Sequence, residues 1–277
     1  MKATVKLWNG LSFPSIGFGT ATLGGDTCVL AVKEAVQMGY RLIDTASQYG
    51  NEVEVGEGIR QSEVSRESLF VCSKLWDDDH GYESTHRAVQ SALERLGLEY
   101  LDLYLIHWPN PRSLREIGYE THNAQSWRAM EELYREGKLR SIGVSNFQPH
   151  HLEALLKHAS IPPVVNQICL HPGRTQSETV SYCCEYGLLL EAYSPLGAGR
   201  VLNHPVILAM AERYGKSPSQ ICLRWHLQNG FIPLPRSSRV ERIRTNLDIY
   251  DFRLEQEDVD ALSKLDVHIR ILPDPDE

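Results

Sequence analysis

An acid and a phenol stand five residues apart in the segment LIDTASQYGNE, residues 42–52. Asp44 ends an apolar run, and Tyr49 follows on a turn closed by Gly50 and Asn51. A phenol with a pKa near ~10 is a poor acid or base at neutral pH unless a nearby cation favours its ionised form. Proton transfer through Tyr49 therefore requires a lysine close in space.

A lysine and a histidine end the next two apolar runs. Lys74 follows the run LFVCS, and His107 lies near the end of LDLYLIHW. Considered alone, each side chain also has an ordinary structural role, such as a helix N-cap for Asp44 or a packed surface aromatic for Tyr49. Their position at the ends of three successive strands predicts that the four groups meet at one place. His171, in LHPG, lacks such a position, and we interpret it as structural.

A repeating module positions these strand ends. It consists of an amphipathic helix, a glycine suited to the helix C-terminus and then at once an apolar strand. The glycines are Gly39, Gly97, Gly137, Gly187 and Gly230. Weaker strands at 69–73 and 163–167 and a run at 16–20 complete a set of about eight, the number in a closed parallel barrel. The near-continuous apolar strands are typical of a parallel sheet covered by helices.

This alternation predicts an α/β fold, a (β/α)8 TIM barrel of roughly 250 residues. No Ser-, Gly- or Pro-rich linker divides the chain, so we expect residues 1–277 to form one domain. Residues 3–14 alternate around Asn9 and Gly10, a dipeptide that favours a two-residue turn, which predicts an N-terminal β-hairpin. A short C-terminal tail follows the barrel. A doubly wound open sheet is the alternative, but the sequence lacks the GxGxxG turn typical of that fold.

Composition excludes several classes of function. The formal net charge of −8 disfavours a nucleic-acid partner. The N-terminus has no apolar signal core, and no segment approaches the ~18 uninterrupted apolar residues of a membrane span. We therefore expect a soluble, cytoplasmic protein without a membrane partner. The six cysteines include no CxxC pair, and we interpret them as buried, reduced thiols.

The remaining strand ends distinguish between kinds of chemistry. A metal hydrolase needs several histidines and carboxylates around one ion, and only Asp44 and His107 qualify, so we expect no metal. A glycosidase needs two facing carboxylates; Glu191 is the candidate partner of Asp44, but it lies inside an apolar run and we expect it to point away. Amide side chains and the Tyr193 ring instead suit protonation of a carbonyl oxygen beside a flat heteroaromatic ring, which favours hydride transfer.

Four arginines follow the last predicted strand in the otherwise acidic chain. They are Arg236, Arg239, Arg242 and Arg244 in PRSSRVERIRTN, residues 235–246. This segment opens a helix at the position where TIM barrels often bind phosphate, and arginine matches phosphate oxygens in a bidentate way. A solvated helix face paired with Glu241 is the alternative.

A series of motifs resembles the aldo-keto reductase family over essentially the whole chain. They are GFGTA at 17–21, LIDTASQYGNE at 42–52, SKLW at 73–76, LIHWP at 105–109, GVSNF at 143–147, NQICLHP at 166–172, YSPLG at 193–197 and the arginine-rich segment. The short tail ILPDPDE is similar to prokaryotic members grouped with diketogluconate and glyoxal reductases.

The resemblance implies a catalytic tetrad and bound NADPH. Tyr49 would donate a proton to the carbonyl oxygen, Lys74 would lower the pKa of Tyr49, Asp44 would pair with Lys74, and His107 would orient the carbonyl and complete the oxyanion site. Carboxamide contacts are implied for Ser145, Asn146 and Gln167, stacking on the nicotinamide for Tyr193, and a ribose contact for Thr20. Pyrophosphate contacts are implied for Ser194, Leu196 and Gly197, and 2′-phosphate contacts for Arg236, Ser237, Arg242 and Asn246.

The sequence departs from the family pattern at the expected 2′-phosphate site and near the expected substrate site. Arg236 replaces a lysine but keeps its charge, and Cys169 stands where a carboxylate is frequent. Ala21 replaces a bulky aromatic, which leaves Trp76 and Trp108 as the expected apolar walls of the substrate site. A short tail predicts a more open pocket.

The leading hypothesis is NADPH-dependent reduction of small aldehydes or ketones to alcohols, by a monomer or weak dimer. The alternative is an NADPH-binding redox-sensing or channel-associated subunit with little turnover, although such a protein has no need of the complete tetrad. A sugar hydrolase on the same barrel would act without NADPH and depend on Glu191.

Overall fold

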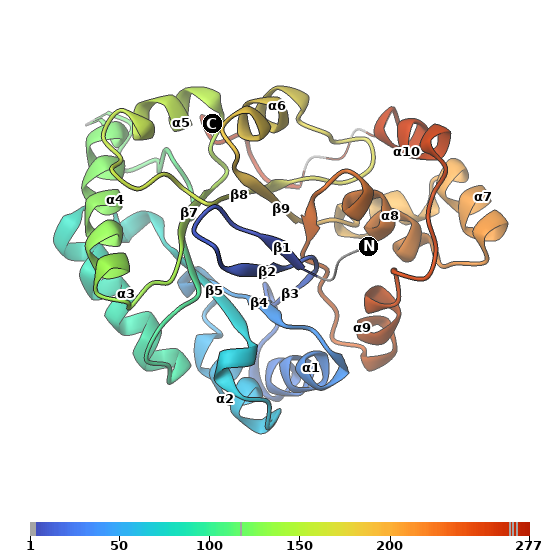
Figure 1. Cartoon of the computed structure of the whole chain (residues 1–277), viewed down its shortest axis with the longest axis horizontal. Helices are drawn as coiled ribbons and strands as arrows, with labels where there is room; N and C mark the ends of the chain where they lie inside the picture. Colours follow the sequence, from blue (N-terminus) through green and yellow to red (C-terminus); the bar gives the residue numbers. More distant parts are fainter. Residues whose placement is uncertain (1–3, 117, 266, 268, 270) are drawn as a thin grey trace.

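Eight parallel strands form a nearly closed barrel in the computed structural model (Figure 1). The structure describes residues 4–116, 118–265, 267, 269 and 271–277. The strands follow one another around the barrel in chain order. They are β3 (Gly17–Gly19), β4 (Leu42–Asp44), β5 (Phe70–Leu75), β6 (Leu103–Ile106), β7 (Ile142–Ser145), β8 (Val165–Cys169), β9 (Leu189–Tyr193) and β10 (Ile232–Pro233). The predicted (β/α)8 fold is confirmed, although the strands expected at 69–73 and 163–167 begin one to two residues later.

Helices connect the strands and surround the barrel (Figure 1). They are α1 (Gly25–Met38), α2 (Glu52–Gln61), α3 (Tyr82–Leu96), α4 (Tyr119–Arg135), α5 (Pro149–Leu156), α6 (Ser177–Glu185), α7 (Pro205–Tyr214), α8 (Pro218–Gln228), α9 (Val240–Leu247) and α10 (Gln256–Ser263). The five glycines expected at helix ends all have positive φ, from 66° at Gly97 to 116° at Gly39. Left-handed backbone ends a helix at little cost only when the residue lacks Cβ, so each glycine turns the chain back into the next strand.

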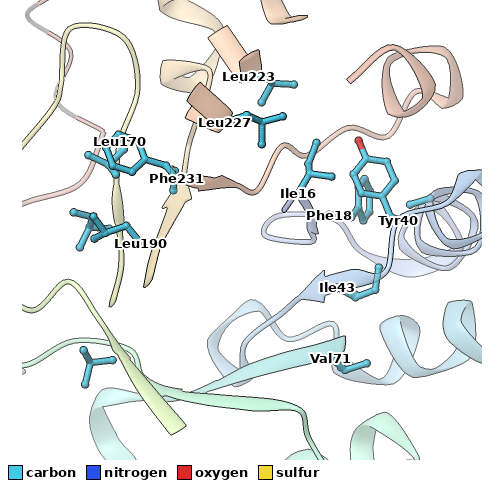
Figure 2. Packing of buried hydrophobic residues seen from close by; sticks show 14 of the residues in the cluster. Ile16, Phe18, Tyr40, Ile43, Val71, Leu170, Leu190, Leu223, Leu227 and Phe231 are labelled. Atoms are coloured by element: carbon cyan, nitrogen blue, oxygen red, sulfur yellow. The ribbon is translucent and has the colours of Figure 1, made fainter. Parts of the chain in front are cut away.

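Alternate residues of each strand face opposite sides of the sheet and build two separate cores. On β4, Ile43 packs outward against the helices, whereas Leu42 belongs to the cluster that fills the barrel interior. Figure 2 shows part of the outer core, where Phe18, Tyr40 and Ile43 lie together. Because of the same alternation, the side chain of the last residue of several strands points toward the mouth of the barrel.

The barrel closes between its first and last strands. The Gly19 amide donates to the Pro235 carbonyl at 3.1 Å. A Cβ added at Gly17 would lie 2.5 Å from the Leu234 side chain and 2.7 Å from that of Leu42. Glycine at position 17 thus lets the edges of the sheet approach one another, with buried leucines filling the interior beside it.

A β-hairpin covers the N-terminal end of the barrel. Its strands β1 (Thr4–Lys6) and β2 (Ser12–Pro14) pair antiparallel and lie across the barrel centre in Figure 1. The Phe13 ring packs edge-on against Phe70 with centroids 4.6 Å apart. The expected hairpin is present in the described residues from Thr4 onward; residue 3 lies outside them. The predicted two-residue turn is wrong: Leu7 bonds to Leu11 around three residues, because Gly10 adopts φ 86° and adds one residue to the turn.

All six cysteines are free thiols, as expected; five are buried, whereas Cys184 is exposed. In the part of the chain that the structure describes, none of the helices combines the length and apolar character required to cross a bilayer.

Candidate active site

A cavity of about 1230 Å³ opens at the carboxyl ends of the strands. Asp44, Tyr49 and His107 line it, together with the segment after β9, the start of α9 and the C-terminal tail. Strand alternation explains the arrangement, because Asp44, Lys74 and His107 occupy inward-facing positions of neighbouring strands or directly follow them. Tyr49 is brought over the mouth by the short helix η1 (Ser47–Tyr49), which ends at Gly50 with φ 65°.

Lys74 contacts three neighbouring residues at the centre of the site. Its ammonium nitrogen lies 2.7 and 2.9 Å from the two Asp44 carboxylate oxygens and 2.9 Å from the Thr45 carbonyl oxygen. It also lies 3.3 Å from the Tyr49 hydroxyl oxygen. Lys74 is fully buried, so these contacts replace the water that the ammonium loses on folding. The phenol, ammonium and carboxylate expected to converge therefore do so.

Burial and charge oppose each other at this cluster. Burial raises the pKa of Tyr49 above its ordinary value, and the Lys74 ammonium counteracts part of that rise. Burial would lower the pKa of Lys74, but the negative charge of Asp44 above all raises it and holds it above its ordinary value. The lysine is thus charged and the phenol protonated at neutral pH. Lys74 lowers the pKa of Tyr49, as expected, but this effect is smaller than the rise caused by burial.

His107 stands beside Tyr49 as a neutral imidazole. The centroids of the Tyr49 and His107 rings are 5.9 Å apart, and the Trp76 ring centroid lies 5.4 Å from that of the imidazole. Burial, reinforced by Lys74, holds the pKa of His107 well below its usual range. Its Nδ1 is buried without a hydrogen-bond partner among the described residues. An N–H in that position would be costly, so the proton belongs on Nε2, which can then donate into the cavity.

Gln167 links the tetrad to a carboxylate that we expected to point elsewhere. Its amide nitrogen donates to Asp44 at 2.9 Å and to Glu191 at 2.9 Å. The expectation that Glu191 points away is wrong: its side chain is fully buried inside the barrel, beside its register neighbour Gln167. The apolar run was misleading because inward positions of β9 alternate with Leu190 and Ala192, which face the outer core.

Asn146 joins β7 to β9 at the cavity wall. Its amide nitrogen donates to the His107 carbonyl oxygen at 2.9 Å and to the Ser145 hydroxyl at 3.1 Å, and its oxygen accepts from Tyr193 at 2.9 Å. Asn146 has a φ of 62°, a strained value for a residue with a side chain. The Ser145 hydroxyl donates to the Gln167 carbonyl oxygen and supports the wall from behind.

Most of the residues expected to bind cofactor or substrate border this one cavity. Those that line it are Asn146, Gln167, Tyr193, Ser194, Leu196, Arg236, Ser237, Arg242, Asn246, Trp76 and Trp108. Thr20, Ser145 and Gly197 do not line it; Thr20 is fully buried, and its hydroxyl donates to the Asp44 carbonyl oxygen. These three lie directly behind the wall, where they hold neighbouring residues in place.

Arg236 and Arg242 reach the cavity from the segment before α9 and from the helix itself. Both side chains are exposed, and neither guanidinium group has an ion-pair or hydrogen-bond partner in the described part of the chain. Asn246 is buried on the same helix face. Two unpaired guanidinium groups beside a helix N-terminus form a site suited to a phosphate dianion.

The C-terminal tail is a part of the cavity wall that the sequence did not suggest. Although short, it contributes Ile271, Leu272 and Pro273 to the lining. Asp276 fastens it, with contacts of 3.1 Å to His150 and 3.0 Å to His151. These two histidines lie on α5, far from the tail in sequence, and no periodic pattern announces the contact.

Comparisons with known proteins find relatives over nearly the whole chain. The family model described as "Aldo/keto reductase family" matches residues 15–267. The chain is 49% identical to glyoxal reductase of Bacillus subtilis (strain 168), over 100% of the chain and 98% of that protein. It is 40% identical to methylglyoxal reductase DkgA of Escherichia coli (strain K12), over 99% and 97%.

A solved structure with cofactor has the same fold. The Bombyx mori aldo-keto reductase in complex with NADP is 36% identical and superposes with a TM-score of 0.85. The match covers 94% of this chain and 91% of the insect protein.

Proposed function

The chain belongs to the aldo/keto reductase family, and on that premise we propose that it reduces small aldehydes and ketones to alcohols with NADPH, using Tyr49 as the proton donor. The observation that carries the proposal is the 3.3 Å approach of the Lys74 ammonium to the Tyr49 hydroxyl at the cavity mouth. We further propose that residues 1–277 form one cofactor-binding domain.

The residues present fit NADPH. The amide oxygen of Gln167 has no partner among the described residues yet is not enclosed, so it faces the cavity and can accept from a carboxamide. Tyr193 offers a ring face beside it, and Arg236 with Arg242 offers unpaired positive charge at the far end for a 2′-phosphate. When bound, the dihydronicotinamide supplies the hydride that reduces the carbonyl carbon.

The protein groups complete the reduction by delivering a proton. Tyr49, kept protonated by burial, transfers its proton to the carbonyl oxygen as negative charge develops there. Lys74 stabilises the phenolate that remains, and Asp44 keeps the ammonium in place. The Nε2–H of His107 donates to the same carbonyl oxygen and orients it.

Small carbonyl compounds are the substrate class that the site favours. The relatives named glyoxal reductase and methylglyoxal reductase point to short, reactive carbonyl compounds. In this chain, Trp76 and Trp108 provide apolar walls close to Tyr49, whereas Ala21 leaves room on one side. Contact with these apolar walls would therefore contribute to substrate selection.

Tyr49→Phe tests the proposal. This variant keeps the ring but removes the proton donor, so the rate of NADPH oxidation with methylglyoxal should fall by roughly 10²–10⁴-fold while NADPH still binds. NADPH binding is followed by fluorescence titration in parallel. A rate that survives in the variant would exclude the Tyr49 role, and wild-type protein that binds NADPH but turns over no carbonyl substrate would favour the redox-sensing alternative.

A further inference from the structure

Glu191 is a buried acid whose place in the proposed reaction is indirect. It is fully buried and is not among the residues that line the cavity, so it lies behind the wall. One of its oxygens accepts from the Gln167 amide nitrogen at 2.9 Å, and the other is buried without a partner among the described residues. Among the described residues, the hydrogen-bond partner of Glu191 is thus Gln167, which belongs to the cavity wall.

The Gln167 amide is held between two acids. Both hydrogens of its nitrogen are used, one by Asp44 and one by Glu191, each at 2.9 Å. Because carboxylate and carboxyl oxygens accept from an amide nitrogen, this pair also settles which end of the amide is nitrogen and which is oxygen. The oxygen is left to face the cavity, and it has no hydrogen-bond partner among the described residues.

Asp44 alone would hold the amide less firmly. Its Oδ1, which accepts from Gln167, is also the oxygen closest to Lys74, at 2.7 Å. One hydrogen bond fixes a distance but allows the amide plane to turn about it, whereas two bonds in different directions fix the plane. Burial, with a smaller contribution from the Asp44 charge, raises the pKa of Glu191 to about 8. Glu191 is therefore largely uncharged at neutral pH, and it still accepts through its carbonyl oxygen.

We propose that Glu191 is a positioning residue for the nicotinamide: together with Asp44 it fixes the Gln167 amide so that its oxygen faces, and accepts from, the carboxamide N–H of the cofactor. The inference rests on the proposed function, since it assumes that the nicotinamide lies against Gln167. The inference also connects cofactor recognition to the proposed catalytic residues. The Gln167 amide, which would bind the carboxamide, donates to Asp44, and Asp44 pairs with Lys74.

Two substitutions separate positioning from simple burial. Glu191→Gln keeps a carbonyl oxygen for Gln167 in the same place, whereas Glu191→Leu keeps the volume but leaves one amide hydrogen without an acceptor. Asp102→Asn is the matched control: Asp102 is also a buried acid, but it bonds to Val71 and Arg140 at the other end of the barrel. Thermal melting of all variants confirms that each is folded before binding is measured.

A comparison of three ligands isolates the contribution of the carboxamide contact to binding. They are NADP⁺, the analogue in which an acetyl group replaces the carboxamide, and adenosine 2′,5′-bisphosphate, which has no nicotinamide. Glu191→Leu should bind NADP⁺ roughly three- to tenfold more weakly, the range for one lost hydrogen bond, and should bind the bisphosphate as wild type does. Its preference for NADP⁺ over the acetyl analogue should shrink by the same factor. Glu191→Gln should stay within about twofold of wild type for all three ligands, because it keeps the hydrogen bond.

The outcomes distinguish this inference from the proposed function. If wild type binds neither NADP⁺ nor the bisphosphate, the cofactor assignment itself is wrong. If wild type binds both, the positioning role is overturned by any of three results: Glu191→Leu binds NADP⁺ as wild type does, it weakens both ligands equally, or Asp102→Asn shows the same selective loss. A Glu191→Gln variant as impaired as Glu191→Leu would likewise overturn it.

Discussion

The Lys74 ammonium and the Asp44 carboxylate form a buried ion pair in which the nitrogen lies 2.7 Å from the nearer oxygen. Lys74 is fully buried, and the Asp44 side chain is only 5% exposed. The pair extends through Gln167 to Glu191, so it belongs to a chain of polar groups that crosses the barrel interior. Structure and proposed catalysis therefore depend on the same atoms.

Removing one partner of this ion pair should cost both stability and activity. Lys74→Met leaves the Asp44 charge buried and unpaired, which should lower the free energy of unfolding by roughly 3–5 kcal/mol. Adding Asp44→Asn should recover part of that loss, because the unpaired charge is gone. Urea denaturation of both variants measures this. Carbonyl reduction should remain lost in both; activity in the double variant would contradict the role of Lys74.

Arg242 should set the preference for NADPH over NADH. Arg242→Ala should weaken NADPH binding by roughly 1–3 kcal/mol, the range for a charge-assisted contact, and leave NADH nearly unchanged. Arg244→Ala is the control, because Arg244 is exposed on the same helix but does not line the cavity. Fluorescence titration with each cofactor gives both affinities. Equal weakening of NADPH and NADH would argue against a phosphate contact.

His151 should make the fold sensitive to acid. Its Nδ1 accepts a hydrogen bond from the backbone N–H of Gln148 at 3.2 Å. Protonation of Nδ1 would therefore break this cap at the start of α5. Burial, followed by the proximity of His150, lowers the pKa of His151 to about 4, whereas an unfolded histidine titrates near ~6.5. The unfolded chain therefore takes up the proton first, and stability is lost as pH falls from about 6.5 to about 4.

The size of this loss is on the order of 3 kcal/mol, from about 1.4 kcal/mol for each pKa unit. The His151→Gln variant should have a flatter dependence of unfolding free energy on pH over that interval. Denaturant titrations at pH 7, 5.5 and 4 compare it with wild type. Parallel curves for the two proteins would mean that His151 does not titrate with a lowered pKa.

Gly17 should be intolerant of any side chain. In Gly17→Ala the new methyl group would meet Leu234 and Leu42 at less than van der Waals distance, which should cost roughly 1–3 kcal/mol of stability through overpacking. Gly24→Ala is the control, because no heavy atom lies within 4 Å of a Cβ added there. Thermal melts of the two variants give the comparison. A fully stable Gly17→Ala protein would show that the leucines can move aside.

The strand ends were predictable from sequence because helix-ending glycines followed at once by near-continuous apolar runs fix both their order and their direction. The period-two geometry of a strand also held the information on Glu191. Tyr193 was expected to face the mouth, and a residue two positions earlier on one strand shares its face. The apolar neighbours Leu190 and Ala192 concealed this, since they belong to the opposite, outer face.

Other features depend on contacts that the linear pattern does not contain. Nothing in the segment at positions 271–277 signals that Asp276 would meet His150 and His151, because the contact spans more than a hundred residues. The three-residue turn at Gly10 reflects a choice between two turn types that Asn-Gly permits. Thr20 and Ser145 belong to family motifs, but their hydroxyls bond to backbone carbonyl oxygens behind the cavity wall. Only the side-chain geometry reveals this role.

The hairpin at the bottom of the barrel has a kinetic consequence. Phe13 and its neighbours fill that end of the barrel, so we expect ligands to enter and leave the cavity at the opposite end, where it opens. In the proposed reaction, substrate, product and nucleotide would then share one opening, and product release rather than the chemical step would limit turnover.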